Sequence, residues 1–173
     1  MSERKTLTIV DFDDTLFFTG RCIENASKKI TGRRMGRRAV RKLPKALKAK
    51  VYALAFSKYS HNSIPNLRLH KILSRAKGPV YVLSARLNSN KAKMLELMRQ
   101  HGVHADRIIT RKEASKKDEE WKLSVFKRLA RRNQRIIAYE DKRDNIAYIS
   151  ERMGKSPPTF YLVRPNAVKR FPV

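Results

Sequence analysis

Cysteine is nearly absent from this sequence. The 173 residues include a single cysteine, Cys22, which excludes an intramolecular disulfide framework and a cysteine-based zinc site. The sequence also lacks a signal-peptide pattern and any apolar run of the roughly 20 residues that a membrane-spanning helix requires. We therefore expect a soluble, intracellular protein without integral membrane association.

Acidic residues are missing from a long central stretch. No Asp or Glu occurs between Glu24 and Glu96, whereas the same stretch holds 19 Lys and Arg residues. The formal net charge of the chain is +26. Clustered Lys and Arg release counterions when they neutralise phosphates, so the charge favours a polyanionic partner. Nucleic acid, RNA or DNA, is the first candidate, and an anionic membrane surface is the second.

Six of the acids form two groups, one near each end of the chain: Asp11, Asp13 and Asp14, and Glu140, Asp141 and Asp144. Carboxylates placed side by side repel one another unless a cation lies among them. Because each group follows an apolar run of strand length, this pattern indicates a site for a divalent metal ion.

The distribution of apolar residues predicts an α/β fold. Strand-length, β-branched runs occur at residues 7–10, 79–84, 107–110, 135–139 and 159–163. Between them, apolar residues recur at helical spacing in two segments: Ala92, Leu95 and Met98, and Trp121, Val125, Phe126 and Leu129. Strands that alternate with amphipathic helices predict a Rossmann-like parallel sheet, with ligands bound beyond the carboxyl ends of its strands. The length fits one domain, residues 1–173.

Four segments resemble the motifs of the haloacid dehalogenase (HAD) superfamily of phosphatases. "IVDFDDTLF" is similar to the first motif, Asp-x-Asp-x-Thr after a strand, and "VYVLSAR" to the second, a strand that ends in Ser or Thr. "EEWKLSVFKRL" fits the third, which supplies a lysine, and "IIAYEDKRDN" fits the fourth, a strand that ends in paired acids. The similarity is greatest to the polynucleotide 3'-phosphatase and RNA-repair-like branch, where "LSAR" and "YED" recur at similar spacing.

This resemblance implies a catalytic mechanism. Phosphomonoester hydrolysis needs a nucleophile, a proton donor and positive charge around the phosphoryl oxygens. Asp11 is the implied nucleophile, which forms an aspartyl phosphate. Asp13 is the implied general acid for the leaving oxygen and then the base for the water that cleaves the intermediate. The implied substrate ligands are Ser84 and Lys122 for the phosphoryl oxygens, together with Thr15 and Arg86.

The resemblance also implies Mg²⁺ as the cofactor, held by Asp11, the main-chain carbonyl of Asp13 and an acid of the fourth motif. Here the fourth motif departs from the pattern of two Asp residues followed by Arg. The metal pair is therefore either Glu140 with Asp141 or Glu140 with Asp144.

Simpler roles compete for several of these residues. Asp14 is suited to capping a helix, and Asp144 to capping the helix that follows the fourth motif. Ser84 alone is equally typical of a strand-end hydroxyl. Lys116 and Lys117 are alternatives to Lys122 as the lysine of the third motif.

Residues 20–76 form a candidate cap, because insertions at this point cover the site in the HAD superfamily. Apolar residues predict one helical face, made of Val40, Leu43, Leu47, Val51 and Leu54, with Pro44 in its first turn or at a kink. A second helix is expected near residues 63–66, with an apolar face made of Leu69, Ile72, Leu73 and Ala76.

Residues 32–42, "GRRMGRRAVRK", are predicted to form a mobile basic arm. Its arginines are candidate contacts to a nucleic-acid backbone: Arg33, Arg34, Arg37, Arg38 and Arg41. A solvated charged face and a helix on an anionic membrane are the alternatives. The segment from Arg164 onward is expected to be an extended arm.

Three functions are consistent with the sequence. The first is an Mg²⁺-dependent phosphatase that acts on nucleic-acid ends, with a 3'-phosphate favoured. The second is a structural or binding component of a ribonucleoprotein or virion that keeps a HAD scaffold. The third is a small-nucleotide phosphatase, which the strong positive charge disfavours.

Overall fold

A mostly parallel, six-stranded sheet forms the centre of the protein. The computed structural model describes residues 6–113, 117–131, 135–154 and 157–172. The sheet strands are β1 (Thr6–Asp11), β4 (Val80–Leu87), β5 (Arg107–Arg111), β6 (Arg135–Glu140), β7 (Thr159–Arg164) and β8 (Ala167–Arg170). Their order is β5-β4-β1-β6-β7-β8, and only β8 runs antiparallel to its neighbour. The predicted α/β fold is confirmed, as are the five predicted strands.

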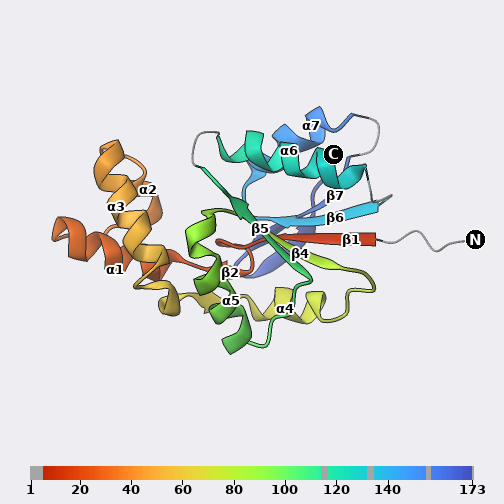
Figure 1. The fold of residues 1–173 in the computed structure, drawn as a ribbon. Coiled ribbons are helices and arrows are strands. Elements are labelled where there is room, and N and C mark those ends of the chain that lie inside the picture. Colours follow the sequence, from red (N-terminus) through yellow and green to blue (C-terminus); the bar gives the residue numbers. More distant parts are fainter. Residues whose placement is uncertain (1–5, 114–116, 132–134, 155–156, 173) are drawn as a thin grey trace, which may run out of the picture.

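Helices cover both faces of this sheet (Figure 1). They are α4 (Leu67–Leu73) and α5 (Lys91–Gln100) on one face, and α6 (Asp118–Ala130) and α7 (Arg143–Arg152) on the other. Side chains of a strand point alternately to the two faces. In β1, Leu7 and Ile9 pack with α6 and α7, whereas Val10 packs with α4 and α5. Burial of β1 on both faces explains its continuous apolar sequence.

Three helices form a separate body, which we call the helical lobe, and it projects beyond one end of the sheet (Figure 1). It consists of α1 (Gly20–Thr31), α2 (Arg37–Val40) and α3 (Lys45–Phe56). The lobe has its own apolar cluster, which includes Cys22, Ile23, Val40 and Val51. The chain leaves the sheet through β2 (Phe17–Phe18) and returns through β3 (Ile64–Pro65), and these two short strands pair with each other.

The structure corrects several details of the predicted insertion. The expected single helical face is divided, because α2 ends at Val40 and α3 begins only after Pro44. Leu69 and Leu73 of α4 pack in the core beside the sheet and not in the cluster of the lobe. The predicted cap, residues 20–76, therefore includes one helix, α4, that packs with the sheet.

The predicted mobile arm at residues 32–42 is wrong, because this segment folds against α1. The Ser27 hydroxyl accepts a hydrogen bond from the Met35 N–H over 2.8 Å, and residues 37–40 form α2. The extended C-terminal arm is also wrong. Its residues Ala167–Arg170 form β8, which pairs with β7. Periodicity within a helix or strand missed both features, because one is a side-chain to main-chain contact eight residues apart and the other is a tight antiparallel hairpin.

The predicted apolar face of α5 is shifted. Leu95 is 44% exposed, and Ala92 is exposed as well. The residues that α5 buries are Met94, Leu97 and Met98. The predicted face shares only Met98 with the buried face. Leu95 and Leu97 are both apolar but lie on opposite sides of the helix, so the apolar pattern alone did not show which side is buried.

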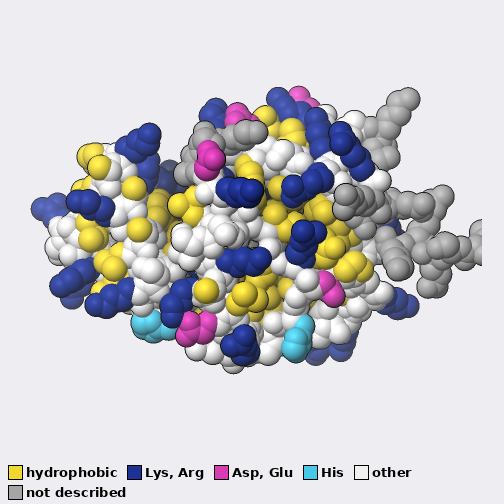
Figure 2. Space-filling model, viewed as in Figure 1, with side chains coloured by type: hydrophobic (Ala, Val, Ile, Leu, Met, Phe, Trp, Pro, Cys, Tyr) yellow, Lys and Arg dark blue, Asp and Glu magenta, His cyan; other side chains and the backbone are white. Residues whose placement is uncertain are grey.

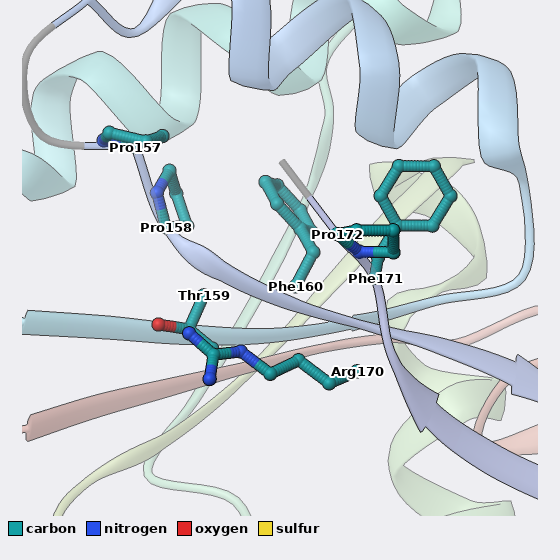
Figure 3. Close-up of a pocket in the computed structure, with 7 residues that line it drawn as sticks. All are labelled: Pro157, Pro158, Thr159, Phe160, Arg170, Phe171 and Pro172. Carbon is teal, nitrogen blue, oxygen red and sulfur yellow. The ribbon is translucent and has the colours of Figure 1, made fainter.

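A cavity of about 620 Å³ lies at the amino end of the sheet, where β7 begins and β8 ends. Figure 3 shows its lining residues: Pro157, Pro158, Thr159, Phe160, Arg170, Phe171 and Pro172. Parallel strands place their carboxyl ends at the opposite edge, so this cavity lies away from the usual ligand site of such sheets. None of the described helices is long and apolar enough to span a bilayer.

Candidate active site

Three acids and one lysine meet at the carboxyl ends of β1 and β6. These strands are neighbours, so Asp11 at the end of β1 lies beside Glu140 at the end of β6. The Lys122 ammonium, from α6, donates hydrogen bonds to Asp11 Oδ1 and Glu140 Oε2, each over 2.6 Å. All three side chains are buried. Oxygens of Asp11, Glu140 and Asp141 lie within 4.8 Å of one another.

The charges of this cluster are unbalanced. Burial raises the pKa of Asp11 well above its usual value, opposed by Lys122 and reinforced by Glu140 and Asp141. Burial and the charge of Glu140 raise the pKa of Asp141 to about 7. Burial disfavours the ammonium of Lys122, yet Asp11 and Glu140 hold its pKa well above the usual value. Three neighbouring carboxylates around one lysine favour the addition of another cation.

Asp13 is held by an arginine from the next strand. Arg86 of β4 donates from Nε to Asp13 Oδ2 over 3.0 Å and from Nη2 to Asp13 Oδ1 over 2.8 Å. The guanidinium lies between the rings of Phe12 and Phe56, 4.8 and 3.9 Å from their centroids. Burial acts to raise the pKa of Asp13, but the charge and hydrogen bonds of Arg86 lower it overall. Asp13 is therefore a carboxylate at neutral pH.

The hydroxyls of the first two motifs lie at the same edge of the sheet. The Ser84 hydroxyl of β4 is fully buried and accepts a hydrogen bond from the Arg86 N–H over 3.2 Å. The Thr15 hydroxyl donates to Asp141 Oδ1 over 3.4 Å. Both hydroxyls thus help to fix the positions of neighbouring site residues.

Asp14 organises the turn between β1 and the helical lobe. It has a positive φ of 59°, which Asp tolerates better than most residues. Its Oδ1 accepts hydrogen bonds from the N–H and hydroxyl of Thr19, each over 3.0 Å. Its Oδ2 lies 2.8 Å from Arg37 Nε. Asp14 therefore supports the start of α1 and ties the lobe to the sheet.

A cavity of about 620 Å³ lies between the carboxyl ends of the strands and the helical lobe. The sheet side contributes Asp11, Asp13, Asp14, Ala85, Arg86, Arg111, Asp118, Asp141 and Lys142. The lobe side contributes Arg37, Arg41, Lys48, Tyr52 and Phe56. The volume lies within the range of about 300–1,000 Å³ that is typical of small-ligand sites. Negative carboxylates and positive side chains thus face each other across one cavity.

Several candidate site residues lie outside this arrangement. Asp144 is exposed in the first turn of α7 and does not join the carboxylate cluster, so the geometry favours the pairing of Glu140 with Asp141. Lys117 is exposed, and Lys116 lies outside the described residues. Among the basic residues of the lobe, Arg33, Arg34 and Arg38 are exposed and do not line the cavity, whereas Arg37 and Arg41 do.

Sequence reasoning missed a second charged group at the rim of the cavity. Asp118, at the start of α6, accepts a hydrogen bond from Arg111 Nη2 over 2.9 Å and another from Lys142 Nζ. Burial opposes the ionised form of Asp118, but Lys122 and Lys142 lower its pKa overall. The run of acids at residues 118–120 was the available signal, although acids are common in the first turn of any helix.

Solved structures of known proteins share this fold. SP0104 from Streptococcus pneumoniae, a haloacid dehalogenase-like family hydrolase, aligns with 94% of this chain and 95% of its own, at a TM-score of 0.60 and 16% identity. YfnB from Bacillus subtilis, described as a HAD-hydrolase and solved with magnesium bound, aligns with 95% of this chain and 91% of its own, at 0.64 and 12%. The chain has the HAD fold.

A chain of the Pnkp1/Rnl/Hen1 RNA repair complex has a similar fold, at a TM-score of 0.54 and 18% identity. In a second structure, a chain of the Pnkp1/Rnl/Hen1 complex aligns with 94% of this chain at a TM-score of 0.62 and 14% identity. The alignment covers 46% of that chain, so this protein spans less than half the length of that neighbour. Neither a family model nor a curated protein significantly matches the sequence.

Proposed function

We propose that this protein is a metal-dependent phosphomonoesterase that acts through an aspartyl phosphate on Asp11, with nucleic-acid ends as substrates. The observation that carries the proposal is the group of Asp11, Lys122, Glu140 and Asp141 at one end of a cavity, beside the Asp13–Arg86 pair. It supplies a nucleophile, an acid–base group and fixed positive charge within one site.

Asp11 attacks phosphorus, and the bond between phosphorus and the leaving oxygen breaks. Asp13 then gives its proton to that oxygen, and later takes a proton from the water that cleaves the acyl phosphate. Because Arg86 lowers the pKa of Asp13 in the free protein, the acid step requires Arg86 to share its charge with the substrate. A phosphoryl group beside Arg86 weakens its hold on Asp13 and raises the pKa of that carboxyl.

Lys122 and Ser84 complete the positive and polar environment of the phosphoryl group. Lys122 holds Asp11 in place over 2.6 Å, and its charge favours the extra negative charge of the transition state. Ser84 lies within β4, directly after Leu83, which is the register partner of Asp11, and its hydroxyl is proposed to donate to a phosphoryl oxygen. Thr15 positions Asp141 through its hydrogen bond.

The carboxylate cluster fits Mg²⁺. Oxygens from Asp11, Glu140 and Asp141 are the ligands that this hard cation prefers. Burial, together with the charge of Glu140, raises the pKa of Asp141, and a bound cation would favour its ionised form. The main-chain carbonyl of Asp13 remains the fourth proposed ligand. When bound, the ion supplies charge that stabilises the phosphoryl oxygens.

Two observations favour nucleic-acid ends over small metabolites. The helical lobe carries Lys and Arg over the face that Figure 2 shows, in a segment without acids from residue 25 to residue 95. A structural neighbour with a similar fold belongs to an RNA repair complex. Among the ends, we favour a 3'-phosphate.

The decisive experiment compares phosphate release from oligonucleotides with a 3'-phosphate or a 5'-phosphate and from mononucleotides. Release from none of them would contradict the proposal.

Magnesium should stabilise the folded protein. An ion that binds only the folded state at 100 times its Kd adds about 2.7 kcal/mol. We expect Mg²⁺ to raise the melting temperature of the wild-type protein, and Asp141→Asn to lose most of this rise. Asp144→Asn is the matched control and should respond as the wild type does. Differential scanning fluorimetry measures these melting temperatures. If Asp144→Asn lost the rise and Asp141→Asn kept it, the metal pair would be Glu140 with Asp144.

The exposed arginines of the lobe should contribute to binding through phosphate contacts. Arg37 is left intact because it pairs with Asp14. Replacing Arg33, Arg34 and Arg38 by Ala should flatten the dependence of log affinity on log salt by about 0.7 for each lost contact to a single strand. Turnover of a small phosphate ester should not change.

A variant with the same loss of charge provides the control for this prediction. Arg99, Lys127 and Arg128 are exposed on α5 and α6, away from the lobe. Replacing them by Ala should leave the salt dependence nearly as in the wild type. If log affinity depended on log salt with the same slope in the two triple variants, the lobe arginines would not contact phosphates.

A further inference from the structure

The helical lobe presents one row of α3 side chains to the active-site cavity. Lys48, Tyr52 and Phe56 are spaced four residues apart, which places them on the same side of a helix. All three line the cavity together with Arg41 from the end of α2. Each of the three is only partly buried. The wall opposite the catalytic carboxylates therefore has two aromatic rings beside two cations.

A stacked column fixes the position of Tyr52. Its ring lies 5.7 Å from that of Phe56, at an interplanar angle of 21°. Phe56 in turn packs on the Arg86 guanidinium at 3.9 Å, and Arg86 also lies over Phe12. The column runs from Tyr52 in the lobe to Phe12, which lies between Asp11 and Asp13 in the sequence. Tyr52 is its outer member, so a planar group that enters the cavity can extend the stack.

The neighbouring cations are available to a ligand. Within the described residues, neither Arg41 nor Lys48 forms an ion pair, in contrast to Arg37 and Arg86. No acid occurs in the lobe after Glu24. Two cations without a protein counter-ion, beside an aromatic platform, match a nucleotide that carries a further phosphate.

We propose that Tyr52 stacks on the base of the terminal nucleotide, and that Arg41 and Lys48 bind the phosphodiester adjoining that nucleotide. This inference rests on the proposed function, because it assumes that the terminal phosphoryl group lies at Asp11. Aromatic stacking is tolerant of base identity. The protein should therefore select for the presence of a terminal base and of a second phosphate, with little preference for sequence.

The test uses two 3'-phosphorylated oligonucleotides that differ only at the last nucleotide, which is normal in one and abasic in the other. Tyr52→Leu should weaken binding of the normal end by roughly tenfold, because stacking on an aromatic side chain typically contributes that much or more. Tyr52→Phe keeps the ring and should bind as the wild type does. Neither variant should change binding of the abasic end.

Binding is measured by fluorescence anisotropy in excess chelator, so that it does not depend on turnover. Tyr59→Leu is the control, since Tyr52 and Tyr59 both pack against the cluster of the lobe but only Tyr52 lines the cavity. If Tyr52→Leu weakened both ends equally, or neither, Tyr52 would have no role in base recognition and the inference would be overturned. A wild-type protein that failed to release phosphate would instead count against the proposed chemistry.

The adjoining phosphate is tested separately. Lys48→Met should flatten the salt dependence of oligonucleotide binding by about 0.7 and should leave binding of a nucleoside 3'-monophosphate unchanged, because that ligand lacks the phosphodiester. If Lys48→Met weakened the binding of both ligands equally, Lys48 would lie at the terminal phosphoryl group, and its assignment to the adjoining phosphate would be overturned.

Discussion

Asp11→Asn is expected to abolish phosphate release, with a fall in kcat of at least about 1,000-fold, as for the removal of other catalytic nucleophiles. An amide oxygen is a poor nucleophile, and the acyl phosphate on Asp11 cannot form without the carboxylate. The substitution changes no volume. Glu140 still pairs with Lys122, so the protein should remain folded.

This expectation is checked by two measurements on purified protein. Phosphate release gives kcat, and acid quenching with a labelled substrate traps the phosphoenzyme, which should be present in the wild type and missing in Asp11→Asn. Asp144→Asn serves as the control, because Asp144 is exposed and outside the carboxylate cluster. Undiminished turnover by Asp11→Asn would refute the proposed chemistry.

The sheet, and the edge of it that carries the candidate site, were predictable because they depend on local sequence. A strand buried on both faces must be apolar throughout, so β1 and β6 were visible as runs that end in Asp11 and Glu140. Parallel strands bring their carboxyl ends to one edge. From those two facts alone, the acids at the two ends of the sequence were expected to meet.

The partners of the charged residues were not predictable in the same way. The sequence shows that Arg86 follows Ser84, but not that its guanidinium lies between Phe12 and Phe56 and holds Asp13. Likewise, the spacing of Lys48 and Tyr52 indicates a shared helix face but not the cavity that this face lines. Such contacts depend on how the lobe packs against the sheet, which periodicity within one segment does not encode.

The burial of Lys122 has a measurable consequence for the stability of the protein. The side chain is 2% exposed and contacts two buried carboxylates. Lys122→Met retains most of the length of the side chain but removes the charge, which leaves Asp11 and Glu140 without a counter-ion. Breaking a buried ion pair in this way typically costs about 3–5 kcal/mol. In a chain of this size, that loss lowers the melting temperature by roughly 10 °C or more.

Magnesium should separate the effect of Lys122→Met on stability from its effect on chemistry. With the lysine charge gone, the carboxylate cluster is more negative, so Mg²⁺ should raise the melting temperature of the variant more than that of the wild type. Turnover should stay about 100-fold or more below the wild type even in saturating Mg²⁺, because the charge beside the phosphoryl group is missing. Lys117→Met, at an exposed position before α6, should leave both stability and turnover unchanged. If Lys117→Met were the inactive variant and Lys122→Met turned over normally, the lysine of the third motif would be Lys117, and Lys122 would serve only to hold the buried acids together.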